Sequence, residues 1–136
     1  MTGFRSKCFL VIILLVMFYS CGAIRPAPNE DKLHARAEKL WEAKVEDDWS
    51  TIYEMTVESF REKVEPKKFA RAPLLDVKSY SIKKVKVDPP EGEVTVDFQF
   101  THMGFEFDNI TKEKWLWENG EWFWNIKPMN FPLTDK

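Results

Sequence analysis

Four side chains of this sequence could carry acid–base chemistry in an enclosed site: Tyr53, Asp97, His102 and Asp108. A tyrosine beside a protonated carboxylic acid can hold an enolate oxygen, provided that burial raises the pKa of the acid. Asp97 lies between Val96 and Phe98 in an alternating segment, and Asp108 follows Phe107, so both carboxylates are expected to face solvent. His102 and Asp108 could still converge near a strand end. Tyr53 is expected to be a core residue with a satisfied hydroxyl.

Signals for other kinds of catalytic site are absent from the sequence. His34 and His102 have no cysteine partner and no ligand spacing, so we expect no metal site. No phosphate-binding glycine loop and no G-x-S-x-G or H-E-x-x-H motif occurs, so we expect no cofactor. The formal net charge of −2 lacks the basic footprint of a protein that binds nucleic acid. The sequence therefore favours a non-catalytic binding or assembly role and keeps a small-molecule enzyme as the alternative.

Tryptophans gather in the segment KWLWENGEWFWN, from Lys114 to Asn125. Asn119-Gly120 predicts a type I′ turn, because both central residues of that turn need positive φ. The turn places Trp117 opposite Trp122 and Trp115 opposite Trp124, so all four rings share one face of a hairpin. The segment is similar to the designed tryptophan-zipper peptides, which form such a hairpin on their own.

The other face of this hairpin is apolar as well, because Leu116 lies opposite Phe123. Both faces therefore require cover from the rest of the chain, from a partner or from a ligand. We expect some of the aromatic side chains to form a binding surface for a homodimer, for another envelope protein or for a small apolar ligand. The predicted binding residues are Trp115, Trp117, Trp122 and Trp124.

Helical periodicity precedes the strands. Asn29 predicts the N-cap of a first helix, whose apolar stripe runs from Leu33 to Val45. Asp48 predicts the cap of a second helix that reaches Phe60, and a single kinked helix is the alternative. Pro66 ends this segment and predicts a short third helix over Lys67 to Arg71.

From Leu75 onward the apolar period changes towards 2, which indicates strands. We expect a strand over Val77 to Asp88 with a bulge at Lys83-Lys84, and an alternating strand over Glu93 to Thr101. A further strand is expected around Phe105 and Phe107, before the hairpin. The predicted fold is α+β, with two or three N-terminal helices packed on a curved antiparallel sheet of four or more strands that ends in the Trp-rich hairpin.

The first residues predict export. Arg5 and Lys7 precede an apolar run from Cys8 to Tyr19 that is short for a membrane span, so residues 1–20 are expected to be a signal peptide. Ser20-Cys21-Gly22 resembles a bacterial lipobox, which predicts a lipidated Cys21 and a tether over residues 21–29. The expected location is a membrane-anchored lipoprotein, in the outer membrane if the cell has one. Cleavage by the ordinary signal peptidase, with Cys21 incidental, is the alternative.

The order of elements resembles the nuclear transport factor 2-like superfamily, a cone-shaped, cystatin-like α+β fold. The resemblance rests on Ala37-Glu38-Lys39-Leu40-Trp41, on Asp47 to Tyr53, on Phe60 to Val64 and on the final tryptophan pattern. It implies one domain over residues 30–136 and homodimers formed through the sheet. It also implies a choice between binding members and isomerases, dehydratases or cyclases. An enzyme of this kind would use Tyr53, His102 and Asp108 at the mouth of the cone.

The lipobox generates a direct test. Metabolic labelling with a palmitate analogue is expected to label the wild-type chain and not a Cys21→Ser variant. A soluble wild-type protein that begins after residue 21 would contradict the expected anchor.

Overall fold

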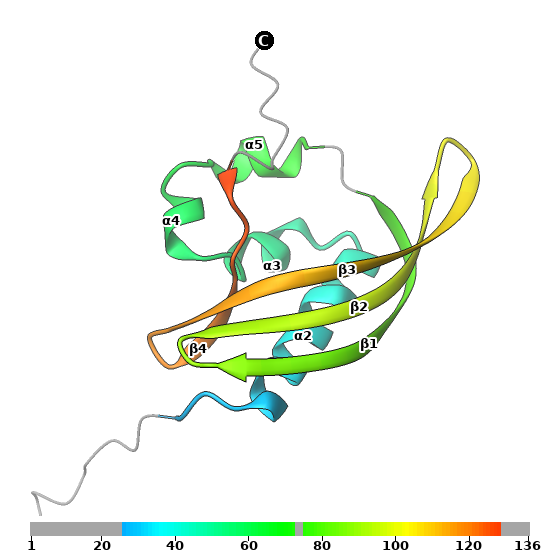
Figure 1. Cartoon of the computed structure of the whole chain (residues 1–136). Coiled ribbons are helices and arrows are strands. Elements are labelled where there is room, and N and C mark those ends of the chain that lie inside the picture. Colours follow the sequence, from blue (N-terminus) through cyan, green and yellow to red (C-terminus); the bar gives the residue numbers. More distant parts are fainter. Residues whose placement is uncertain (1–25, 73–74, 129–136) are drawn as a thin grey trace, which may run out of the picture.

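The computed structural model describes residues 26–72 and 75–128 of the chain. The signal peptide, Cys21 and the first part of the tether lie outside these residues. The structure is α+β, as predicted, with helices followed by four antiparallel strands in one open sheet of order β1-β2-β3-β4 (Figure 1). The elements are α2 (Glu30–Val45), α3 (Trp49–Glu54), α4 (Glu58–Arg61), α5 (Pro66–Ala70), β1 (Asp76–Asp88), β2 (Glu91–His102), β3 (Phe105–Glu118) and β4 (Glu121–Trp124).

The two predicted helix caps are confirmed. The Asn29 side chain accepts a hydrogen bond from the Lys32 amide, and Glu30 and Asp31 lie in the first turn of α2, near the positive end of the helix dipole. Asp48 accepts from the Thr51 amide in the same way at the start of α3. The start of each helix is therefore fixed by local sequence.

The second helix differs from its prediction, because the segment from Trp49 to Phe60 is broken at Met55–Val57. These residues pair with the end of β4: the Trp124 amide donates to Met55 O over 2.7 Å, and the Val57 amide donates to Trp124 O over 3.0 Å. The described chain thus has four helices rather than two or three. Pairing with a strand about seventy residues away replaces helical hydrogen bonds that the local sequence favours.

The strands β2 and β3 are longer than the segments predicted from the sequence. The expected strand around Phe105 and the first hairpin strand form a single element, β3, because β2 pairs with β3 without interruption from Glu91–Leu116 to His102–Phe105. The predicted bulge in β1 is present: the register shifts between Ile82 and Lys84. Lys83 is therefore the extra residue.

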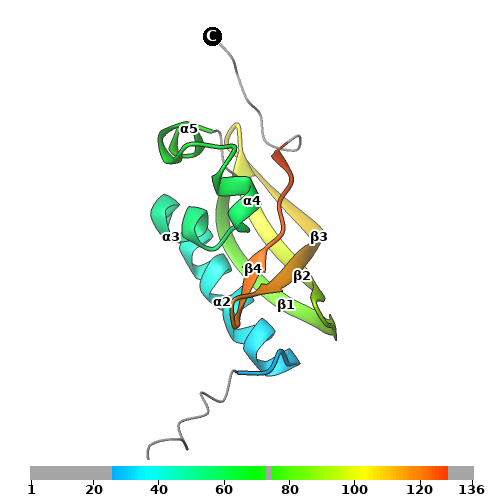
Figure 2. The same ribbon diagram turned by 90° about the vertical axis from the view of Figure 1, so that its left-hand side faces the viewer.

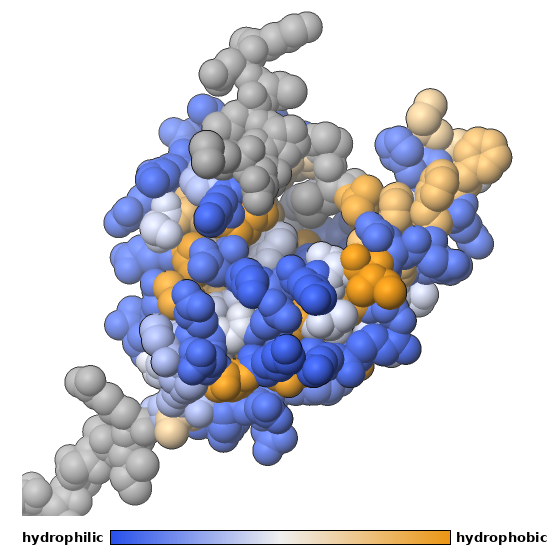
Figure 3. Space-filling view, in the orientation of Figure 1, coloured by the Kyte–Doolittle hydropathy of each residue, from blue (hydrophilic) through white to orange (hydrophobic). Residues whose placement is uncertain are grey.

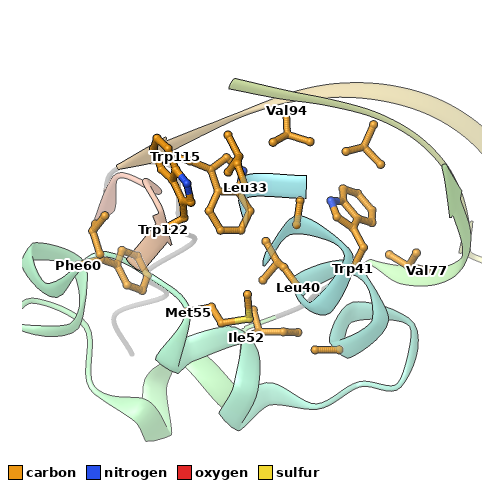
Figure 4. Packing of buried hydrophobic residues seen from close by; sticks show 14 of the residues in the cluster. Leu33, Leu40, Trp41, Ile52, Met55, Phe60, Val77, Val94, Trp115 and Trp122 are labelled. Atoms are coloured by element: carbon orange, nitrogen blue, oxygen red, sulfur yellow. The ribbon is translucent and has the colours of Figure 1, made fainter. Parts of the chain in front are cut away.

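The helices cover one face of the curved sheet, which we call the inner face (Figure 2). Leu33, Leu40 and Trp41 of α2 lie between Val94 of β2 and Ile52 of α3, and all of them are buried (Figure 4). Gly92 permits this approach, because a Cβ atom there would lie 2.5 Å from a methyl carbon of Leu33. The core is a helix layer packed on the inner face of the sheet.

The hairpin of β3 and β4 has Trp115 opposite Trp124 and Trp117 opposite Trp122, with Asn119 and Gly120 at φ values of 51° and 84°. Trp115 and Trp122 are each 1% exposed, whereas Trp117 and Trp124 are half-buried. The Trp122 ring meets Trp117 edge-on at 5.2 Å between centroids. Among the described residues, no acceptor lies within reach of the Trp122 indole N–H.

This burial pattern predicts unequal costs of truncation. Trp122→Ala is expected to lower the free energy of unfolding by about 3–5 kcal/mol, because it empties a core position. Trp117→Ala should cost less, since its ring is partly in solvent. Trp122→Phe is the matched control and should recover much of the loss, because it keeps an aromatic ring and the indole N–H makes no hydrogen bond. Chemical denaturation measures all three, and equal costs for the two alanine variants would contradict this packing.

Candidate binding site

A cavity of about 580 Å³ lies between the helices, the edge of β3 and the chain that follows β4. Its walls combine apolar side chains from the helices and the sheet with polar and charged ones, which are Lys44, Thr111, Lys112, Glu113, Lys114, Asn125 and Lys127. The apolar lining includes Trp41, Ile52, Phe69, Ala72, Phe98 and Trp124. A concave, mostly apolar space with few polar groups is the usual form of a small-molecule site.

A buried carboxylate lies in the wall of this cavity. Glu113 belongs to the inner face of β3, and its side chain is 4% exposed. The Lys44 ammonium donates to its Oε1 over 2.6 Å, and the Trp41 indole N–H donates to its Oε2 over 3.1 Å. Both oxygens therefore have a partner from α2, as a buried charge requires.

Lys44 is held by aromatic rings as well as by charge. Its ammonium nitrogen lies 3.9 Å from the ring centroid of Trp41 and 4.4 Å from that of Trp124. Cation–π attraction and the carboxylate fix the cation in one place, with its side chain 14% exposed. The Lys44–Glu113 pair itself has no net charge, whereas Lys112, Lys114 and Lys127 add positive charge to the lining of the cavity.

The wall behind Trp41 is aromatic and continues into the sheet. Trp41 packs on Phe98 at 4.9 Å and on Tyr80 at 5.9 Å between ring centroids. Burial, together with the charges of Glu38 and Glu42, raises the pKa of the Tyr80 phenol. Tyr80 therefore stays a neutral hydrogen-bond donor at neutral pH, directed at the carbonyl oxygen of Glu38.

The rival catalytic residues do not line this cavity. The Tyr53 hydroxyl donates to the main-chain oxygens of Val64 and Arg61, over 2.8 and 3.2 Å. These bonds join α3 to the last residue of α4, Arg61, and to the turn that follows it. Tyr53 is thus a half-buried structural residue in this fold.

His102 and Asp108 are both exposed and lie on the part of β2 and β3 that projects beyond the helices. Asp108 contacts the amide of Gln99, and Asp97 forms an ion pair with Lys83 over 3.3 Å. Asp97 and Asp108 border a shallow surface depression on the outer face of the sheet. The structure therefore does not bring His102, Asp97 or Asp108 to Tyr53.

The four hairpin tryptophans have different environments. Trp124 lines the cavity of about 580 Å³, Trp117 borders a hollow of about 310 Å³ beside Pro26, and Trp115 and Trp122 belong to the core. Glu113 is a site residue that was not predicted from the sequence. Its position two residues before Trp115 in a strand was the available signal, because it places the carboxylate on the same face as the tryptophans.

Two negative findings concern the described residues only. Among residues 26–72 and 75–128, no group of three or more His, Cys, Asp or Glu side chains could hold a metal ion. In the same part of the chain, no helix has the length and apolar character that a membrane span needs.

Comparisons with known proteins define the fold. No protein-family model matches the chain, and no curated protein matches it. A SEC-C motif containing protein from Psychrobacter arcticus is similar in structure, with a TM-score of 0.58 and 12% identity, over 85% of this chain and 69% of that one. Another, from Rhodopseudomonas palustris, has a TM-score of 0.54 and 16% identity, over 63% of this chain and 69% of that one. At these identities the likeness concerns the fold alone.

The buried ion pair predicts a coupled loss of stability. Lys44→Met leaves the Glu113 carboxylate buried without its cation and is expected to cost about 3–5 kcal/mol of unfolding free energy. Adding Glu113→Gln should recover part of this loss, since the unpaired charge is then gone. Lys39→Met, at an exposed position of α2, is the control and should cost little. If the double variant loses the sum of the two single losses, Lys44 and Glu113 act independently and the pairing is wrong.

Proposed function

We propose that this chain is a lipid-anchored, non-catalytic domain of the cell envelope, of the nuclear transport factor 2-like type, that binds a small apolar ligand. The observation that carries the proposal is the cavity whose apolar lining includes Ile52, Phe98 and Trp124. The ligand lies against the apolar part of the lining, which includes the half-buried Trp124 ring.

The internal pairing of Glu113 supports binding rather than catalysis. A general base must lie within hydrogen-bond reach of the proton that it removes, whereas the Glu113 side chain is 4% exposed and its two oxygens face Lys44 and Trp41. In this proposal the Lys44–Glu113 ion pair is a structural part of the cavity lining and takes no part in a reaction. An isomerase, dehydratase or cyclase remains the alternative, and it would require a ligand that displaces Lys44 from Glu113.

The anchor and the family assignment rest on sequence. Ser20-Cys21-Gly22 and the apolar run before it support lipid attachment, and the described domain begins only a few residues after Cys21. The resemblance to the cone-shaped superfamily is supported by a partly open cavity between the helices and the inner face of an antiparallel sheet. On this proposal the domain presents its cavity close to the membrane surface.

The ligand can be sought in the protein purified from its own envelope. Solvent extraction followed by mass spectrometry is expected to release a small molecule from the wild type. Ala72→Phe should reduce this yield about tenfold, because Ala72 lines the cavity and the added ring would take up part of the space for the ligand.

Ala70→Phe is the matched control, since Ala70 is an exposed residue of the neighbouring helix α5. This variant should keep the ligand at the wild-type level. Equal yields from the wild type and Ala72→Phe, or no molecule from either, would contradict a ligand site in this cavity.

A further inference from the structure

Basic residues gather at the exposed part of the cavity lining. Most residues that line the cavity are buried or half-buried, and the exposed ones are Leu75, Lys112, Lys114 and Lys127. We call the three lysines the lysine rim. Glu113 is the one carboxylate among the described lining residues, and it is already paired with Lys44. The cavity therefore combines a mainly apolar interior with a cationic rim.

Two of the rim lysines have no ion-pair partner in the described chain. Lys114 donates to Glu93 Oε2 over 2.5 Å. This hydrogen bond, and to a smaller extent the charge of Lys112, lowers the pKa of the Glu93 carboxyl. Within residues 26–72 and 75–128, neither Lys112 nor Lys127 forms a salt bridge. An anion from outside can therefore approach these two cations without breaking an ion pair.

The main chain of β3 adds a hydrogen-bond donor at the same place. The Trp117 amide points towards β2, where it donates to Pro90 O. Because backbone groups alternate along a strand, the Lys112 amide points the other way, to the edge of β3. β4 pairs with β3 only from Trp115 to Glu118, so no described strand accepts from this amide. A carboxylate accepts charge-assisted hydrogen bonds from both an ammonium group and a main-chain N–H.

The sheet beside the helices is not an apolar docking surface. In the view of Figure 3, hydrophilic side chains cover most of the sheet, and apolar ones gather on the projecting ends of β2 and β3. Met103 and Phe105 of that projection are 85% and 69% exposed, and neither lines the cavity. The exposed apolar surface and the cavity are therefore separate features of the molecule.

We propose that the ligand of this cavity is an amphipathic anion, with one apolar chain and one end group of the carboxylate class. The chain packs on the buried lining, and the carboxylate stays at the lysine rim between Lys112 and Lys127. A charge buried in the apolar interior without a partner is costly, so this orientation is the favoured one. The inference rests on the ligand-binding role proposed above and adds the charge and the orientation of the ligand.

Photoreactive probes test this charge preference with the full-length protein in its own membranes. Three probes share one photoreactive alkyl chain and end in a carboxylate, an alcohol or an amine, and labelling is normalised to the amount of each probe in the membrane. The carboxylate probe is expected to label the wild type most strongly. Lys112→Gln combined with Lys127→Gln should reduce its labelling about tenfold and leave labelling by the uncharged alcohol unchanged.

Charge reversal gives a gain that loss of folding cannot produce. Lys112→Glu combined with Lys127→Glu should label more strongly with the amine probe than with the carboxylate probe, because the rim then carries the opposite charge. Lys84→Gln combined with Lys86→Gln is the matched control. It removes two exposed positive charges from β1, outside the cavity, and should leave labelling by all three probes at the wild-type level.

Ala72→Phe separates the failure of this inference from the failure of the proposed function. Because Ala72 lines the cavity, this variant should reduce labelling by every probe. If no probe gives labelling that Ala72→Phe reduces, both the ligand site and the anionic ligand are overturned. Cavity labelling that is equal for carboxylate and alcohol, that survives the two Gln changes, or that favours the carboxylate after charge reversal would overturn the anionic ligand alone.

Discussion

The buried carboxylate of Glu113 is the constraint on which the arrangement of sheet and helices depends. A charge in a largely apolar wall is tolerated only with partners, and both partners, Lys44 and Trp41, come from α2. The helix must therefore present this turn to the inner face of β3. The same requirement places the Trp41 ring beside Trp124 with a cation between them, which fixes one end of the cavity.

The tryptophan hairpin of β3 and β4 is the second feature that fixes the core, because it contributes two buried rings, Trp115 and Trp122. Its tight turn gives four rings one face, yet the helices bury only Trp115 and Trp122 fully. Trp124 is the last residue of β4, and its amide donates to Met55 O. Its ring lines the cavity and is not fully buried in the core. One repeated sequence pattern thus yields two structural residues and two that border hollows.

Features that depend on neighbouring residues could be predicted from the sequence, and features that depend on distant residues could not. The caps at Asn29 and Asp48 and the bulge at Lys83 follow from local chemistry. The break at Met55–Val57 depends on Trp124, and the role of Glu113 depends on partners 69 and 72 residues away. The alternation in β3 placed Glu113 on the inner face, but only the tertiary fold shows what neutralises it.

The fold places a partly open cavity on the inner face of the sheet, beside the edge of β3. The central claim is that the cavity between Trp41 and Trp124 holds an apolar molecule. A high-resolution crystal structure of the protein purified from its own envelope tests this most directly. We expect electron density for a small molecule against the apolar lining and the half-buried Trp124 ring, with the Lys44–Glu113 pair intact. A cavity that contains only ordered water, or one closed by a rearrangement of these side chains, would contradict it.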